Sequence, residues 1–328
     1  QICEEVGSQY LKKGAVVLME ASTGKLRACA SFPDYSPENI AEAIEDTENA
    51  PLVNRAFSAY NVGSVFKIVT ASSALSQGLT PSDDYFCSGK VTIGDTDFHC
   101  YTRTGQGILN LDTAMAKSCN PYFIILGLSC DPYKFHASAM DFSFGTPTSF
   151  APGMSSAEGT LPTVEEISSK GACANFSFGQ GSLTATPIQI AQMLTGILNE
   201  GYVMQASLVE GITQDGAFLS ETVQQTTPVR AVTAEAAARV KETLVYSVME
   251  TEGHKARPRY VSAGGKTGTA QTGQFREDGT EILQGWFAGF FPAENPEYIL
   301  VVLAEDAQGS SDATPVFREI VNRMTSRP

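Results

Sequence analysis

A serine and a lysine that could react together stand three positions apart at the start of an apolar run. Ser64 and Lys67 lie in the stretch Tyr60–Val69, where a glycine turn precedes residues typical of a buried helix. Residues at i and i+3 share one helix face, so the hydroxyl and the amine should lie side by side. The unpaired amide groups of a first helical turn are suited to bind a developing anion. This stretch therefore offers a nucleophile, a base and an oxyanion site in one turn.

The same Ser-x-x-Lys pattern occurs a second time, at Ser22–Lys25. That copy lies between two β-prone runs, where a tight hairpin turn is the natural interpretation. Serine and glycine are common turn residues, so we expect the second copy to be structural. Ser64 is the candidate nucleophile because an unbroken apolar helix follows it.

Composition and charge exclude several classes of protein. The chain has 328 residues, of which 42% are hydrophobic, as in a folded globular protein. Its net charge of −14 argues against a nucleic-acid partner, which needs a basic surface. No apolar run reaches the roughly 18 residues of a membrane span. The chain begins at Gln1 rather than methionine, so we expect a processed piece from which an N-terminal anchor has been removed.

The seven cysteines and three histidines show no spacing typical of a zinc site, so we expect no metal. An odd number of cysteines leaves at least one thiol unpaired in the monomer. Cys87 and Cys100 flank a short glycine-containing segment. In an extracytoplasmic protein they could form a disulfide worth about 3 kcal/mol. The sequence leaves this bridge and two free thiols as open alternatives.

Strands are predicted near both ends of the chain. Residues 14–31 are predicted to form a β-hairpin around a Ser-Thr-Gly turn. Towards the C-terminus, further β-prone runs occupy residues 266–271, 285–291 and 298–304.

Helices are predicted between these strands. The helix that begins at Ser64 should end near Gly78, and residues 188–198 carry apolar positions at helical spacing. An alanine-rich helix should run from Thr233 to about Glu252. Four residues that favour the N-cap position directly precede a proline and mark further helix starts: Asn120, Asp131, Thr186 and Thr314.

This order of elements predicts an α+β fold. An antiparallel sheet of about five strands, built from both termini and flanked by helices, would stand beside an all-helical second lobe. The sheet lobe would comprise roughly residues 10–60 plus 230–328, and the helical lobe roughly 61–229. Residues 32–60 are typical of a linker with one short helix, and residues 145–183 are typical of loops around a cleft.

Three further motifs follow Ser64 in a fixed order. Ser118–Asn120 is the only Ser-x-Asn sequence in the chain, Phe178–Gly181 follows it, and Lys266–Thr269 begins with Lys-Thr-Gly. Ser-x-x-Lys, Ser-x-Asn and Lys-Thr-Gly together are the signature of penicillin-binding proteins and class A β-lactamases. Each motif alone is weak, whereas the ordered set at wide spacing is specific.

The sequence resembles the transpeptidase domain of class B penicillin-binding proteins over nearly all of residues 1–328. Asn54–Ala56, Phe-Gly-Gln-Gly at 178–181 and Gly-Lys-Thr-Gly-Thr-Ala at 265–270 carry the resemblance. The chain departs from the family at Val62, where proline is frequent, and at Cys119; neither departure removes a reacting group. The resemblance implies an α/β sandwich of the β-lactamase/transpeptidase type, with an anchor and a pedestal upstream of this chain.

By this resemblance, Ser64, Lys67, Ser118 and Asn120 are the catalytic residues. Ser64 would attack a peptide carbonyl and become acylated, while Lys67 takes its proton. Lys67 can do so only when neutral, so its pKa must fall from about 10.4 to about 7.5, which burial and the charge of Lys266 could achieve. Ser118 would relay a proton to the leaving amine, and Asn120 would hydrogen-bond the substrate backbone.

Substrate binding falls to Lys266, Thr267, Gly268 and Thr269 in the same resemblance. Lys266 and the threonine hydroxyls would bind a terminal carboxylate. The alternate positions 267 and 269 of a strand share one face. The backbone N–H groups of Ser64 and Thr269 would form the oxyanion hole.

The resemblance also implies partners and a location. The donor would be a peptidoglycan stem peptide ending in D-Ala-D-Ala, and the acceptor would be the amine of a second stem peptide. β-Lactam antibiotics would acylate the same serine. A membrane glycosyltransferase is the expected protein partner, and the extracytoplasmic face of a bacterial cell membrane is the expected location. No cofactor and no nucleic acid are expected.

Three alternatives share part of this chemistry. A D,D-carboxypeptidase would release the acyl group to water rather than to an amine. A serine β-lactamase would need a base for rapid hydrolysis; Glu165 and Glu166 lie in the right region but lack the Glu-x-x-Leu-Asn pattern of class A. A non-catalytic sensor would be acylated by β-lactams without turning over a peptide.

Overall fold

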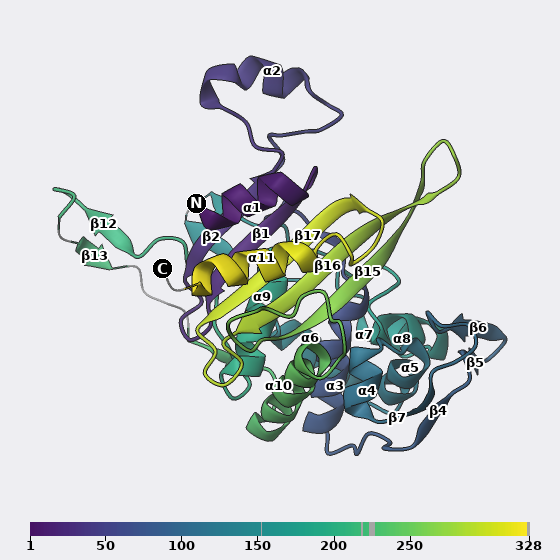
Figure 1. Cartoon of the computed structure of the whole chain (residues 1–328). Helices are drawn as coiled ribbons and strands as arrows, with labels where there is room; N and C mark the ends of the chain where they lie inside the picture. Colours follow the sequence, from purple (N-terminus) through teal and green to yellow (C-terminus); the bar gives the residue numbers. More distant parts are fainter. Residues whose placement is uncertain (152, 218, 223–226, 327–328) are drawn as a thin grey trace.

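The computed structural model describes residues 1–151, 153–217, 219–222 and 227–326. At its centre is a five-stranded antiparallel sheet in the order β15-β16-β17-β1-β2 (Figure 1). Strands from the two ends of the chain pair with each other, as the sequence predicts. The strands of this sheet are β1 (Gly14–Glu20), β2 (Leu26–Phe32), β15 (Gly264–Phe275), β16 (Glu281–Phe291) and β17 (Tyr298–Ala307).

Both faces of the sheet are covered by helices. On one face, Val16 and Leu18 of β1 share an apolar core with α1 (Ile2–Tyr10) and α11 (Thr314–Thr325). On the other face, Val17 belongs to a larger core shared with the helical lobe. Successive side chains of a strand point to opposite faces, so a strand covered on both sides has to be apolar throughout. This explains the continuous apolar run of β1.

The second lobe is built around α3 (Lys67–Ser76) and α9 (Pro187–Leu198). Every residue of α9 from Pro187 to Ile197 is buried, so the helix lies inside the protein. The remaining helices of the lobe and its border are α4 (Leu111–Ala116), α5 (Asn120–Leu128), α6 (Pro132–Asp141), α7 (Val164–Ile167), α8 (Lys170–Ser177) and α10 (Ala234–Met249).

The structure corrects two expectations about this lobe. It is not all-helical, and the expected loop region 145–183 contains α7 and α8. Its strands are too short to give a periodic signal in the sequence. The expected lobe boundaries also take in residues 152, 218, 223–226 and 327–328, which lie outside the described residues. The short antiparallel pairs are β3 (Tyr60–Asn61) with β10 (Thr184–Ala185), β4 (Tyr85–Cys87) with β7 (Gly107–Leu109), β5 (Lys90–Ile93) with β6 (Thr96–His99), β8 (Ser149–Ala151) with β9 (Met154–Ser155), β11 (Tyr202–Val203) with β14 (Val229–Arg230), and β12 (Gly211–Thr213) with β13 (Leu219–Thr222).

Two of the four predicted N-caps before proline are confirmed. Thr186 precedes α9 and Asp131 precedes α6, and each side chain accepts a backbone N–H of the first turn. Asn120 and Thr314 are instead the first helical residues of α5 and α11, and neither helix has a side-chain cap. For Asn120 the reason is that its side chain bonds elsewhere, as the site shows below.

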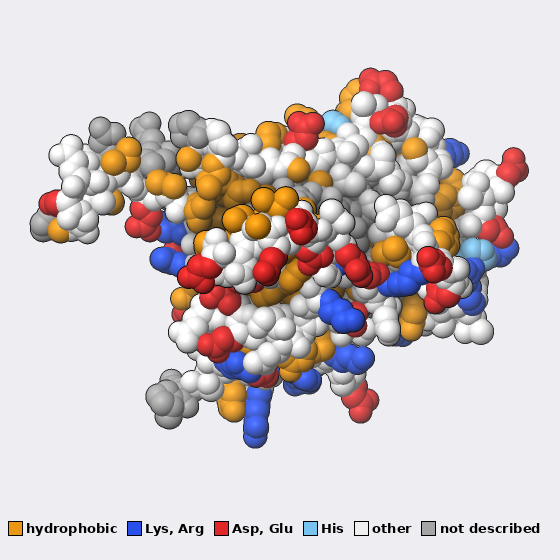
Figure 2. Space-filling view, turned by 90° about the horizontal axis from the view of Figure 1, so that it is seen from above, with side chains coloured by type: hydrophobic (Ala, Val, Ile, Leu, Met, Phe, Trp, Pro, Cys, Tyr) orange, Lys and Arg blue, Asp and Glu red, His pale blue; other side chains and the backbone are white. Residues whose placement is uncertain are grey.

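Of two further regions, one differs from the prediction in its end point and the other contains the predicted short helix. α10 starts after Thr233 as predicted but ends at Met249 rather than near Glu252. The linker region 32–60 carries a 3₁₀ turn at Pro37–Asn39 and helix α2 (Ile40–Glu45), which projects from the body of the protein in Figure 1. From above, hydrophobic side chains gather over this segment (Figure 2); its exposed apolar residues are Tyr35, Ile40, Ile44, Leu52 and Val53. Among the described residues, every helix is too short or too polar to cross a membrane.

The buried amide of Gln189 holds a loop in place. It donates to the carbonyl oxygens of Ser143, Thr146 and Glu158 at 2.9, 3.0 and 2.8 Å, and accepts the Thr186 N–H at 2.7 Å. Gln189→Ala leaves these groups unpaired, so we expect it to lower the free energy of unfolding by about 3 kcal/mol. Urea unfolding followed by circular dichroism measures the change.

A capping residue at the surface provides the control for this prediction. Thr163 is exposed and caps α7 through the same reciprocal bonds with Glu166. Thr163→Ala should cost only about 1 kcal/mol. Equal losses in the two variants would contradict the role given to the buried amide.

Candidate active site

Ser64 and Lys67 lie side by side at the start of α3, as their spacing predicts. Ser64 belongs to a 3₁₀ turn, Gly63–Phe66, that runs into the α-helix at Lys67. Side chains at i and i+3 eclipse one another in a 3₁₀ turn. The Lys67 amine is consequently 3.0 Å from the Ser64 hydroxyl.

Two glycines let this turn lie directly against strand β15. Gly63 has a φ of 59°, and a Cβ there would stand 2.7 Å from the carbonyl oxygen of Thr269. A Cβ on Gly268 would stand 2.8 Å from the side chain of Val65. Only residues without a Cβ permit both approaches. The glycines therefore bring the Ser-x-x-Lys turn and the Lys-Thr-Gly strand to one site.

The Lys67 amine is surrounded by oxygen atoms. It lies 2.7 Å from Asn120 Oδ1 and 2.8 Å from the Ser118 carbonyl oxygen. The hydroxyls of Ser64 and Ser118 are 3.0 and 3.1 Å away. The amide and carbonyl oxygens can only accept, so they hold the N–H groups of a neutral amine. The amine's lone pair is then left to the two hydroxyls, as a base and a proton relay require.

The turn Ser118–Asn120 is aimed at Lys67 rather than at its own helix. Besides binding Lys67, the Asn120 amide donates to the carbonyl oxygen of His99 at 3.1 Å. Ser118 has a φ of 52°, a backbone conformation that residues other than glycine rarely adopt. Backbone strain of this kind concentrates at functional sites.

Burial changes the protonation of both lysines. Lys67 is fully buried and Lys266 is 2% exposed. Burial lowers the pKa of Lys67 from 10.5 to about 7. Burial, followed by the positive charge of Lys67, lowers the pKa of Lys266 well below its ordinary value. A large fraction of Lys67 is therefore neutral near pH 7, where it can accept the Ser64 proton.

The Lys-Thr-Gly strand forms the opposite wall of the site. Lys266 Nζ donates to the carbonyl and hydroxyl oxygens of Thr267 at 3.0 and 3.3 Å. The Thr269 hydroxyl accepts the backbone N–H of Ser310 at 3.1 Å. Thr267 and Thr269 both line the cleft that contains Ser64. The alternate positions of the strand thus share one face, as predicted.

The cleft has a volume of about 680 Å³ and includes residues that the sequence did not single out. Tyr101, Thr102, Gly105 and Gln106 contribute part of its lining from the connection between β6 and β7, and Ser310 contributes near β15. No motif marks these positions. Finding them requires knowing that this connection folds back beside Ser118.

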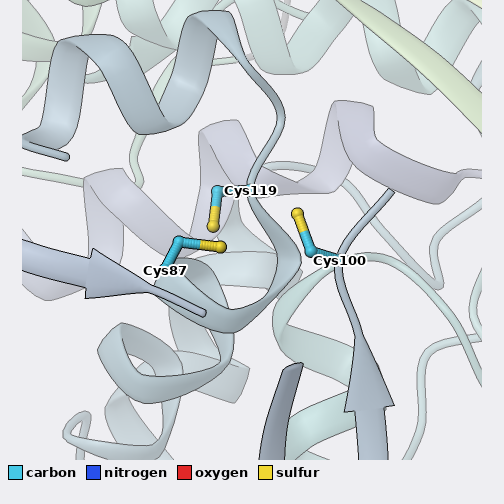
Figure 3. A group of neighbouring side chains, drawn as sticks. All are labelled: Cys87, Cys100 and Cys119. Atoms are coloured by element: carbon cyan, nitrogen blue, oxygen red, sulfur yellow. The ribbon is translucent and has the colours of Figure 1, made fainter. Parts of the chain in front are cut away.

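Three cysteines come together beside the site, although their spacing gives no metal motif. Cys87, Cys100 and Cys119 point toward one another from separate segments (Figure 3), and their sulfur atoms all lie within 4.8 Å of one another. All three are free thiols. Of the two alternatives left open by the sequence for Cys87 and Cys100, a disulfide or two free thiols, the structure has the free thiols. The sequence argument against a metal site rested on spacing alone and did not foresee this group.

Residues 14–322 match the protein family described as penicillin binding protein transpeptidase domain. The chain is 32% identical over 335 residues to the peptidoglycan D,D-transpeptidase PbpA of Mycolicibacterium smegmatis, covering 94% of this chain and 66% of that protein. It is 27% identical over 349 residues to the peptidoglycan D,D-transpeptidase MrdA of Acinetobacter baumannii, covering 96% and 51%. The chain thus spans between half and two thirds of the length of these relatives.

Solved structures of the same kind superpose on nearly the whole chain. The D,D-transpeptidase domain of a peptidoglycan glycosyltransferase from Eggerthella lenta matches with a TM-score of 0.85 and 28% identity, over 98% of this chain and 80% of that one. Penicillin-binding protein A from M. tuberculosis, as an imipenem acyl-enzyme complex, matches with a TM-score of 0.86 and 27% identity, over 99% and 78%. By its sequence match, its fold and the geometry of its three motifs, the chain belongs to the transpeptidase domain family of penicillin-binding proteins.

Proposed function

We propose that this chain is the acyl-transfer domain of a serine D,D-transpeptidase that cross-links peptidoglycan stem peptides and is inhibited by β-lactams. One observation carries the proposal: the Lys67 amine, whose pKa burial lowers to about 7, lies 3.0 Å from the Ser64 hydroxyl. The names of the relatives support the substrate class. The imipenem acyl-enzyme of a structural neighbour supports inhibition by β-lactams.

In the acylation step, Ser64 Oγ attacks the carbonyl carbon between the two D-alanines of the donor. Neutral Lys67 takes the hydroxyl proton as the C–O bond forms. Ser118, 3.1 Å from the same amine, passes a proton to the leaving nitrogen as the C–N bond breaks. The backbone N–H groups of Ser64 and Thr269, residues that both line the cleft, would bind the oxyanion. D-Alanine leaves and the acyl group stays as an ester on Ser64.

In the second step, an amine of another stem peptide attacks this ester. The incoming nitrogen gives up a proton through Ser118 and Lys67, and Ser64 regains its hydroxyl as the new amide forms. Asn120 holds its position through Lys67 and the His99 carbonyl, which leaves its second N–H to bind the substrate backbone. The same groups thus serve both steps in opposite directions.

Lys266, with the hydroxyls of Thr267 and Thr269, is proposed to bind the terminal carboxylate of the donor. Lys266→Gln removes the charge but keeps an N–H donor. We expect the KM for a carboxylate-terminated donor to rise at least about tenfold, since a charged hydrogen bond is worth about 1.5–3 kcal/mol. Steady-state kinetics on the acid and on the matching C-terminal amide measures the effect.

The amide substrate and a surface lysine serve as controls for this prediction. The amide should respond much less, because it carries no charge for Lys266 to bind. Lys255→Gln changes an exposed lysine and should leave both substrates unaffected. Equal losses for acid and amide in Lys266→Gln would contradict carboxylate binding.

We also propose that the sheet lobe and the helical lobe act as one unit, because residues of β15 and residues beside α3 and α5 line the same cleft. Glycan strands that carry stem peptides have to be supplied by a polymerising reaction. A membrane glycosyltransferase is therefore the proposed partner, and the exposed apolar residues around α2 offer a contact surface outside the cleft. This assigns the domain to the extracytoplasmic side of a bacterial membrane, where such strands are assembled.

A competition between an amine and water tests the proposed reaction. The protein is incubated with a D-Ala-D-Ala donor peptide and an amine acceptor, and products are separated by mass spectrometry. Transfer to the amine is the expected main outcome. Release to water alone would identify a D,D-carboxypeptidase. Acylation by a β-lactam without peptide turnover would identify a sensor, and rapid β-lactam hydrolysis would identify a β-lactamase.

A further inference from the structure

The three-cysteine group takes no part in the acyl transfer described above. Cys87 is the last residue of β4, Cys100 follows β6, and Cys119 precedes α5. Their side chains are between 0% and 2% exposed. Three separate segments thus place sulfur atoms around one buried point (Figure 3). Cys119 stands between Ser118 and Asn120, which both line the catalytic cleft.

We propose that Cys87, Cys100 and Cys119 form a binding site for a soft divalent metal ion, with Zn²⁺ as the first candidate. Thiolates at the Zn–S bond length of about 2.3 Å stand about 3.8 Å apart around a tetrahedral ion. The sulfur atoms already lie within 4.8 Å of one another. Side-chain rotations can close this difference, and sulfur ligands favour Zn²⁺ and similar ions over Mg²⁺ or Ca²⁺.

Metal binding at this group exchanges protons for bonds and transfers no electrons. Each cysteine loses its thiol proton to solvent and forms one sulfur–metal bond. Three thiolates and one divalent ion leave a net charge of −1. Within the part of the chain that the structure describes, no further Cys, His, Asp or Glu joins the group. The fourth position of a tetrahedral ion would therefore be taken by water or a small ligand.

A metal ion at this point would join two parts of the cleft. Cys100 begins the connection that contributes Tyr101, Thr102, Gly105 and Gln106 to the lining of the cleft. Cys119 stands between Ser118 and Asn120. Binding both cysteines would hold the Ser118–Asn120 turn in its strained conformation. We therefore expect the ion to be structural and to raise the melting temperature.

Metal titration of the reduced protein tests the inference. Protein purified with a phosphine reductant under argon is titrated with Cd²⁺ and Co²⁺ as spectroscopic probes, and with Zn²⁺ against a chromophoric chelator. We expect one ion per chain, an ultraviolet thiolate-to-cadmium charge-transfer band, and a Zn²⁺-dependent rise in Tm. Cys87→Ser removes a ligand outside the catalytic motifs. Loss of a residue that only hydrogen-bonds to a metal ligand weakens binding by about 10- to 100-fold. Loss of the ligand Cys87 itself should weaken Zn²⁺ binding by more than that.

A cysteine outside the group provides the matched control. Cys29 lies on β2, and Cys29→Ser should bind Zn²⁺ like the wild type. In the wild type, Zn²⁺ should protect Cys87, Cys100 and Cys119 from alkylation, as peptide mass spectrometry can map even if Cys87→Ser fails to fold. Absence of saturable binding, lack of this protection, or a disulfide among these cysteines in protein isolated without reductant would overturn the inference. Because these readouts need no substrate, they stand or fall apart from the proposed transpeptidase activity.

Discussion

Replacing Ser64 with alanine is expected to abolish covalent labelling by a penicillin and to slow peptide acylation on the order of a million-fold. Alanine offers no oxygen to the substrate carbonyl. Besides Ser64, the hydroxyl within hydrogen-bond distance of the Lys67 amine is that of Ser118, at 3.1 Å. Ser118 is therefore the competing candidate for the nucleophile. A labelled penicillin, followed by digestion and mass spectrometry, shows which residue carries the acyl group.

The second Ser-x-x-Lys copy supplies a matched control for this experiment. Ser22 is exposed in the turn between β1 and β2, as the sequence predicts for a structural copy. Ser22→Ala removes the serine of the second Ser-x-x-Lys copy and leaves the cleft unchanged. This variant should therefore be labelled at the wild-type rate. A label on Ser118, or undiminished labelling of Ser64→Ala, would contradict the assignment of the nucleophile.

The features that the sequence predicts well are local or periodic. The Ser64–Lys67 contact follows from spacing within one turn, and the hairpin at 14–31 follows from two β-prone runs around a short turn. The central sheet was predictable because its strands are long, between 7 and 12 residues, and lie near both ends of the chain. The low pKa of Lys67 was predictable because an apolar helix implies burial.

The features that the sequence does not predict depend on contacts between distant segments. The sequence offered Asn120 two roles, a helix cap before proline and a site residue. The Lys67 amine at 2.7 Å and the His99 carbonyl decide its orientation. The left-handed conformation of Ser118 leaves no mark on residue type. The group of Cys87, Cys100 and Cys119 forms only because β4, β6 and the turn before α5 converge. Pairwise spacing in the chain carries no information on such convergence.

The acylation rate of the wild type is expected to rise as the pH passes through about 7. This rise should disappear when Lys67 is replaced. Burial lowers the pKa of Lys67 to about 7, and only the neutral amine can accept the Ser64 proton. The neutral fraction therefore grows as the pH rises past this value and then levels off. Lys67→Arg keeps a permanent charge and Lys67→Met has no base; each should slow acylation by about 100- to 10,000-fold. Stopped-flow acylation with a fluorescent penicillin, over a pH range centred on 7, measures the profile.

The titration of the buried Lys266 can also change the pH profile of acylation, because its pKa is also lowered by burial and by the charge of Lys67. The two effects have to be measured separately. Loss of the Lys266 proton at higher pH would weaken carboxylate binding and bend the profile down for acid substrates. With a substrate that has no carboxylate, the fall at higher pH should be absent and only the rise due to Lys67 should remain. Lys25→Met changes the lysine of the second Ser-x-x-Lys copy, where Lys25 pairs with Glu210 at 2.8 Å, and should keep the wild-type profile. If Lys67→Met retained the step near pH 7, another group would be the base, and the contact between Ser64 and Lys67 would not be the origin of the chemistry.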